Sequence, residues 1–88
     1  MIDLLTFRDF VRVIGADMDQ QLVLALTAGR AEAAAYLGRT PDEEVTDEAM
    51  GTLYLARSHF DDADADRCRQ VGRLLLHPFR ASSGIGGA

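Results

Sequence analysis

Apolar side chains recur three and four positions apart along most of this chain, and no stretch of convincing length alternates apolar with polar residues. The first spacing places apolar side chains on one face of an α-helix, whereas alternation would indicate a β-strand. The pattern is interrupted at Gly15, Gly38, Pro41 and Pro78, residues that end helices or form connections. The sequence therefore predicts an all-α fold, a small bundle of about four helices.

The first predicted helix opens at Thr6 and ends at Gly15. Thr6 would cap the first turn, and Asp9 stands three residues later as in a capping box. Four apolar residues then fall at i, i+3, i+4 and i+7, so we expect them to form one buried face. These residues are Phe7, Phe10, Val11 and Ile14.

The second predicted helix is the longest. It opens at Asp17, with Gln20 three residues later, and ends at Leu37, where Gly38 suits a left-handed helix end. Its expected buried stripe comprises Leu22, Ala25, Leu26, Gly29, Ala33, Tyr36 and Leu37. A second stripe of mostly small side chains, which would let another backbone approach closely, comprises Leu24, Ala28, Ala31 and Ala35. We expect the helix to pack on two sides, and the second stripe is a candidate inter-subunit face.

Residues 38–45 form a polar connection, after which Thr46 would cap a third helix that ends near Phe60. Asp47 and Glu48 suit the positive end of its dipole. Its expected buried stripe comprises Ala49, Leu53, Ala56 and Phe60, with Met50 and Tyr54 beside it. A fourth helix would start at Asp64 or Asp66 and stop by His77, because Pro78 follows; it carries Cys68, Val71, Leu74 and Leu75.

The chain of 88 residues fits a single domain. We assign residues 1–80 to one helical domain and residues 81–88 to a Gly/Ser-rich C-terminal tail. That tail contains Ile85 as its one large apolar residue, too little to offset the entropy of ordering, so we expect it to be flexible.

Nine arginines, no lysine and fourteen acidic residues give a net charge of −5. This charge disfavours a protein whose affinity comes from neutralising phosphates. No apolar run approaches the roughly 18 residues of a membrane-spanning helix, so we expect no membrane association. The single cysteine, Cys68, cannot form an internal disulfide, which favours a reducing cytosol.

No motif predicts catalysis, a cofactor or a metal. Asp62, Asp64 and Asp66 match the first ligands of an EF-hand, but Arg67 stands where the loop needs glycine and Arg73 where it needs a bidentate glutamate. A solvated, helix-capping linker is the better interpretation. The two imidazoles, His59 and His77, and the Cys68 thiol lack an orienting acid or oxyanion hole in any recognisable pattern. A DNA-binding helix-turn-helix near residues 14–19 is disfavoured, because the helix that follows has only Arg30 as a cation.

Three segments together resemble the head-tail connector, or head-completion adaptor, family of tailed phages. They are Ala31-Glu32-Ala33-Ala34-Ala35-Tyr36-Leu37-Gly38-Arg39, the helix from Met50 to Phe60, and Gly72-Arg73-Leu74-Leu75-Leu76-His77-Pro78-Phe79-Arg80. In that family a long Ala-rich helix ends in a similar Tyr-Leu-Gly-Arg stop, and a Leu-Leu-x-Pro-aromatic-Arg segment closes the domain. The resemblance covers residues 17–80. It departs from the family at residues 58–62, where acidic residues replace an expected base.

The resemblance implies a structural, non-enzymatic subunit. Such subunits form a ring of about a dozen copies beneath the portal protein, extend the DNA channel, and hold the stopper or tail-completion protein. DNA would pass through without sequence-specific binding, and the protein, made in the host cytoplasm, would reside in the neck of the virion. Candidate portal or inter-subunit contacts are Leu75, Phe79, Arg80 and Ile85.

An alternative is a small acidic regulatory protein, such as a DNA mimic, that binds one partner. A mimic should present its carboxylates as an extended surface array. In this chain many acidic residues fall in expected linkers and caps, as Asp17, Asp47 and Asp66 do. The sequence therefore favours the connector over the mimic.

Overall fold

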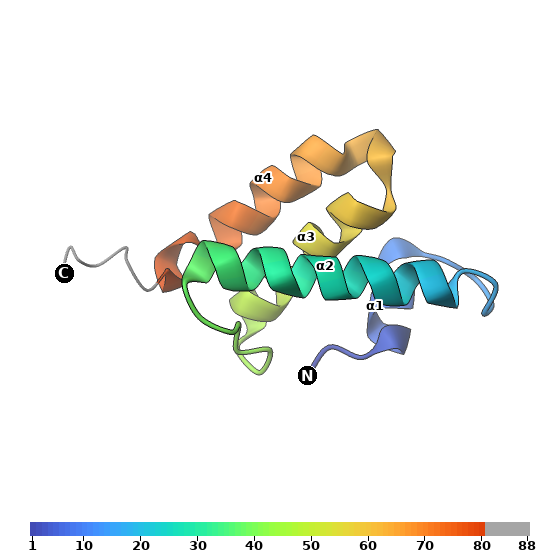
Figure 1. Ribbon diagram of the computed structural model, residues 1–88, viewed down its shortest axis with the longest axis horizontal. Coiled ribbons are helices and arrows are strands. Elements are labelled where there is room, and N and C mark those ends of the chain that lie inside the picture. Colours follow the sequence, from blue (N-terminus) through green and yellow to red (C-terminus); the bar gives the residue numbers. More distant parts are fainter. Residues whose placement is uncertain (81–88) are drawn as a thin grey trace.

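The computed structural model describes residues 1–80, which form four α-helices. In chain order these are α1 (Leu4–Val11), α2 (Asp19–Leu37), α3 (Thr46–Phe60) and α4 (Ala65–Leu76), with short 3-10 helices η1 (Asp62–Asp64) and η2 (His77–Phe79) around α4 (Figure 1). No strand occurs among these 80 residues. The predicted all-α bundle of four helices is confirmed. The predicted tail, residues 81–88, lies outside the described residues.

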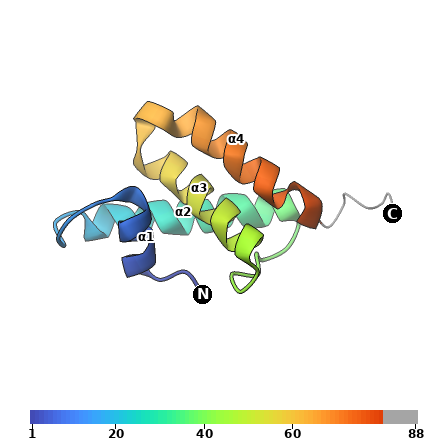
Figure 2. The ribbon, with the colours of Figure 1, turned by 180° about the vertical axis from the view of Figure 1, so that it is seen from behind.

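Helix α3 is the central element of the bundle. It packs against α2 on one side and against α4 on the other, while short α1 crosses the first half of α2 (Figures 1 and 2). Two apolar clusters fill these contacts. The larger one joins α1, α2 and α3 through Ile2, Phe7, Leu22, Ala25, Leu26, Leu53 and Ala56. The smaller one joins α2, α3 and α4 through Ala33, Leu37, Leu55 and Leu76.

Glycines let α3 approach both neighbours at backbone distance. A Cβ atom added at Gly29 of α2 would lie 2.5 Å from the backbone nitrogen of Ala56 in α3. On the other side of α3, a Cβ at Gly72 of α4 would lie 2.9 Å from the carbonyl oxygen of Gly51. Real Cβ atoms do not come this close to a backbone, so both interfaces require glycine, which has no side chain, at these positions.

The first helix differs from the prediction at both ends. Its N-cap is Asp3, whose carboxylate accepts a hydrogen bond of 2.8 Å from the backbone nitrogen of Thr6, so Thr6 is inside the helix rather than its cap. At the other end, Arg12 adopts a left-handed conformation (φ 63°) and stops the helix. Ile14 consequently falls in the connection and is 96% exposed, so the expectation that it is buried was wrong.

Helix α2 begins at Asp19, two residues later than predicted, and no side chain caps it. Its predicted end is confirmed, because Gly38 adopts φ 82° directly after Leu37. The expected stripe is buried throughout except at Tyr36, which is half-buried. Within residues 1–80, Leu24, Ala31 and Ala35 of the second stripe are exposed, and Ala28 is half-buried.

The last two helices bury a wider surface than the apolar pattern predicts. In α3 the first residue is Thr46 and the N-cap is Val45, so Thr46 does not act as the cap. Ala49 and Phe60 are half-buried, whereas three polar residues of α3 are buried: Glu48, Thr52 and Ser58. Helix α4 starts and ends as predicted, but its buried face carries Cys68, Gly72 and Leu76. Leu74 is 67% exposed, because it lies two positions from both Gly72 and Leu76, which face α3.

The close approach at Gly29 predicts whether a substitution there stabilises or destabilises the fold. Gly→Ala inside a helix ordinarily stabilises by about 0.5–1 kcal/mol. Gly29→Ala should instead destabilise by about 1–3 kcal/mol, because its methyl group overlaps the backbone of Ala56. Urea unfolding followed by circular dichroism measures this, with Ala31→Gly on the exposed side of α2 as the control for helix propensity. A more stable Gly29→Ala variant would contradict the packing described.

Candidate functional site

Every exposed residue of α2 is uncharged. These residues are Gln20, Gln21, Val23, Leu24, Thr27, Ala31 and Ala35. The charged residues of the helix are all engaged by other elements: Asp19 binds Arg8 at 2.6 Å, Arg30 binds Glu43 at 2.7 Å, and Glu32 binds His59. In a chain with 26% charged residues, a helix exposed along its length ordinarily carries charge on its outer face.

The predicted inter-subunit stripe lies on this exposed side. Leu24 is 64% exposed, Ala31 and Ala35 are exposed, and Ala28 is half-buried. We call these four residues the outer face of α2. The face has one large apolar side chain near its start and small side chains beyond it, so another helix could approach its second half closely.

The predicted C-terminal contacts gather at the end of α2. Phe79 packs with Tyr36 against the smaller apolar cluster, and Leu75 is half-buried. The Arg80 guanidinium lies 4.6 Å from the centre of the Tyr36 ring, and its Nε donates a hydrogen bond of 3.1 Å to the Tyr36 carbonyl oxygen. This arrangement combines a cation–π contact with a backbone hydrogen bond. The fourth predicted contact, Ile85, lies outside the described residues.

A carboxylate that the sequence analysis did not single out joins three helices. Glu32 of α2 accepts a hydrogen bond on Oε1 from His59 of α3 at 2.7 Å, and its Oε2 binds Arg69 of α4 at 3.0 Å. Arg73 lies 3.6 Å from the same Oε2. Glu32 precedes Ala33, which is part of the predicted buried stripe, so the sequence could have indicated that Glu32 pairs with a cation on another element. The sequence does not identify which cation this is. The role of His59 within the chain is therefore to hold α3 to α2.

The other two residues considered for chemistry are placed separately. His77 lies on η2 with its Nδ1 3.3 Å from the Tyr36 hydroxyl, and Cys68 is buried against α3. The three aspartates of the EF-hand-like run lie in helical backbone, Asp62 and Asp64 in η1 and Asp66 in α4. Among residues 1–80, no group of three or more His, Cys, Asp or Glu side chains is placed to hold a metal ion.

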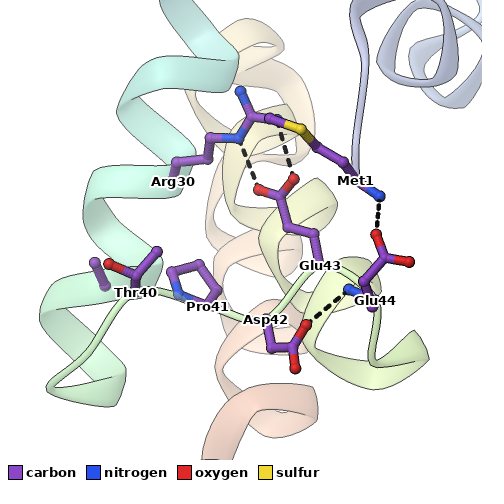
Figure 3. A pocket seen from close by; sticks show the side chains of 8 residues that line it. Met1, Arg30, Thr40, Pro41, Asp42, Glu43 and Glu44 are labelled. Atoms are coloured by element: carbon purple, nitrogen blue, oxygen red, sulfur yellow. Dashed lines mark hydrogen bonds and ion pairs between the residues drawn. The ribbon is translucent and has the colours of Figure 1, made fainter.

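One pocket lies between the second half of α2, the connection that follows it, and the start of the chain (Figure 3). It encloses about 550 Å³ and is lined by Met1, Arg30, Ala34, Thr40, Pro41, Asp42, Glu43 and Glu44. Arg30 holds both carboxylate oxygens of Glu43, at 2.7 and 3.1 Å, while the backbone nitrogen of Ile2 donates to the same carboxylate at 2.8 Å.

Partial burial alone would raise the pKa of Glu43. The hydrogen bonds from Arg30 and from the Ile2 nitrogen, together with the charge of Arg30, outweigh burial and lower that pKa. Glu43 is thus an ion-paired carboxylate that accepts three hydrogen bonds, two from Arg30 and one from the Ile2 nitrogen. Glu44 likewise binds the terminal ammonium of Met1. The charged groups around this pocket fasten the chain's start and the α2–α3 connection to α2.

A second buried carboxylate fixes the same connection. Glu48 of α3 is 2% exposed, and its Oε1 accepts hydrogen bonds from Arg39 at 2.8 Å and from the backbone nitrogen of Asp42 at 2.9 Å. The hydrogen bond from Arg39 is the main cause that lowers the pKa of Glu48, and it prevails over burial. Glu48 lies in the first turn of α3, as expected of a residue that suits the positive end of the helix dipole, and the connection folds over it.

Comparison with known proteins finds no relative. The chain matches no protein-family model, no curated protein and no solved structure. No helix within residues 1–80 is long and apolar enough to cross a membrane.

The burial of Glu48 predicts a pH dependence. A carboxyl group whose pKa is lower in the folded chain than its ordinary value of 4.5 stabilises the fold above that value, and the stabilisation disappears as pH falls through the folded pKa. Glu48→Gln should therefore reduce the free energy of unfolding by about 1–3 kcal/mol at pH 7 and flatten its decline below pH 5. Urea unfolding between pH 3 and 7 measures both effects.

Asp47→Asn provides the matched control, since Asp47 is the exposed neighbour of Glu48 on the same helical turn. It should change the unfolding free energy by no more than about 0.5 kcal/mol. Equal effects of the two substitutions would contradict the role assigned to Glu48.

Proposed function

We propose that this protein is a structural, non-enzymatic head-tail connector subunit of a tailed phage or phage-like particle. In this proposal its copies form a ring below the portal protein, extend the DNA channel, and provide the platform for a stopper or tail-completion protein. The protein would reside in the neck of the virion. The proposal starts from the resemblance of residues 31–39, 50–60 and 72–80 to that family.

The observation that carries the proposal is the uncharged outer face of α2. Water solvates charged helix faces well, whereas covering a long face without charge is favourable in free energy, because it removes apolar surface from water. Leu24 offers apolar area, while Ala31 and Ala35 allow close contact with another backbone. A subunit that meets neighbours on two sides in a ring needs such a surface in addition to its own core.

The C-terminal corner supports the same proposal. Tyr36 belongs to the first segment that carries the resemblance and Arg80 to the third, and the two side chains are in contact. Segments separated by more than thirty residues thus meet at one corner of the fold, where the described chain ends. Two motifs that meet in space make the resemblance more specific than either motif does alone.

The overall charge fits a DNA channel that does not retain DNA. With a net charge of −5, a ring of these subunits would repel the phosphate backbone on average and let it pass. We therefore assign the partners as portal protein, copies of this chain and a stopper or tail-completion protein, with DNA as a passenger.

The alternative of a DNA-mimicking or other acidic regulatory protein has less support. A mimic depends on carboxylates displayed together on the surface. Here Glu32, Glu43 and Glu48 are held by arginines of the same chain, and Asp19 is held by Arg8. These carboxylates stabilise the fold and are not available to imitate a phosphate array.

Electron microscopy of the particle's portal protein, mixed with this chain, tests the proposal. We expect additional ring-shaped density at the tail-facing end of the portal. Leu24→Asp should weaken this attachment by about tenfold or more, because it buries a carboxylate at the proposed contact. Circular dichroism should show unchanged helical content, since Leu24 is largely exposed in the single chain.

Leu5→Asp is the matched control. Leu5 is an exposed leucine on α1 rather than on the outer face of α2. This variant should attach as the original chain does. A portal without added density, or particles that lack this protein yet retain their genome and join tails, would refute the connector function.

A further inference from the structure

Positive charge is concentrated in the last part of the described chain. Residues 67–80 contain four arginines, Arg67, Arg69, Arg73 and Arg80, and no acidic residue. The rest of the sequence carries all fourteen acidic residues and the other five arginines. Residues 67–80, which include most of α4 and all of η2, therefore form a basic surface on an acidic protein, exposed at Arg67 and Arg73, and this predisposes the surface to contact carboxylates.

A groove opens on this basic surface beside the end of α2. It has a volume of about 330 Å³ and is lined by Tyr36, Gln70, Arg73, Leu74 and His77. Leu74 provides exposed apolar surface, and the Arg73 side chain is half exposed. Glu32, 3.6 Å from Arg73, already binds Arg69 and His59 at shorter distances. Arg73 therefore retains donors for another carboxylate.

The opposite end of α2 carries a protruding apolar side chain. Ile14, 96% exposed, lies in the connection between α1 and α2, and left-handed residues at Arg12 (φ 63°) and Gly15 (φ 83°) define the path of the backbone on either side. Asp17 follows it and is exposed. We call residues 12–18 the tip. A nearly fully exposed isoleucine on a shaped turn costs solvation free energy that a partner can recover.

We propose that the tip of one copy docks into the groove of a second copy, with Ile14 against Leu74 and Tyr36 and with Asp17 facing Arg73. Ile14 and Leu74 are both exposed and apolar, and Asp17 and Arg73 are exposed and opposite in charge. Because the tip precedes α2 and the groove lies at its last turn, about 28 Å of helix separates them, so one chain cannot make this contact with itself.

A contact between two different surfaces joins copies head to tail. Such heterologous contacts close into a ring when the rotation between neighbours is suitable. The inference therefore rests on the proposed function for its setting, and it names the surfaces through which the copies of the ring meet. It leaves uncovered the outer face of α2, for which contact between neighbours was proposed above.

A charge exchange tests the contact without any portal protein. Asp17→Arg places two cations together in every contact between identical chains, and Arg73→Asp places two carboxylates together. Each variant alone should associate about fivefold more weakly than the original chain in analytical ultracentrifugation. An equimolar mixture of the two variants should recover the association, because each tip then finds a groove of opposite charge.

Asp62→Arg serves as the control, since Asp62 is exposed in η1, outside both surfaces; this variant, whose tip and groove are unchanged, should associate as the original chain does. A mixture of Asp17→Arg with Arg73→Asp that associates no better than either variant alone overturns the proposal. So does an original chain that remains monomeric at about 1 mM, the concentration at which even weak specific contacts are populated.

Two other occupants of the groove would also be revealed. If residues 81–88 of the same chain fill it, a chain ending at Arg80 associates more strongly while Asp17→Arg has no effect, and this result overturns the proposal. If the groove takes an acidic segment of another protein, the charge exchange again has no effect. Portal attachment is measured separately, so loss of the connector function and loss of this contact give different results.

Discussion

The fold depends on the backbone contacts that glycine permits on both sides of α3. Gly29 admits the backbone of Ala56, and Gly72 lies against Gly51. With α3 enclosed in this way, 80 residues bury two apolar clusters rather than one. The arrangement leaves α2 and α4 as outer helices, each with one face committed to α3 and one face open. The surfaces available for partners therefore follow directly from the central position of α3.

Ion pairs hold the helices and the connections of this small protein together, in addition to its apolar core. Glu32 joins α2 to α3 and α4, Glu43 joins the start of the chain to α2, and Glu48 holds the α2–α3 connection. Partly exposed pairs contribute little each, but these carboxylates also accept backbone or multiple hydrogen bonds, which fixes geometry. One consequence is that these three glutamates are held by arginines of the same chain, while Arg67 and Arg73 of α4 remain exposed.

The helix ends and the buried face of α2 were predicted from residues close to them in the sequence. Gly38 and Pro78 set the ends of α2 and α4, and the apolar stripe of α2 identified most of its buried face. The first helix was misplaced because Asp3 and Thr6 are both good caps, and only the position of Ile2 and Phe7 in the core selects Asp3. The burial of Glu48 and the exposure of Leu74 depend on which helix covers which face, and that information is not local to either residue.

The tip and the groove could not be predicted from the sequence, because the exposure of their apolar residues also depends on how the helices pack. Ile14 continues the spacing of Phe7, Phe10 and Val11, so a helix through Gly15 would have buried it. The left-handed turn at Arg12 takes it out of that face. Leu74 likewise stands in a run of three leucines of which only Leu76 is fully buried. The sequence spacing of both residues predicts burial, but both are exposed in the folded chain. Two such residues at opposite ends of α2, beside opposite charges, are better explained by a contact between copies than by two independent failures of burial.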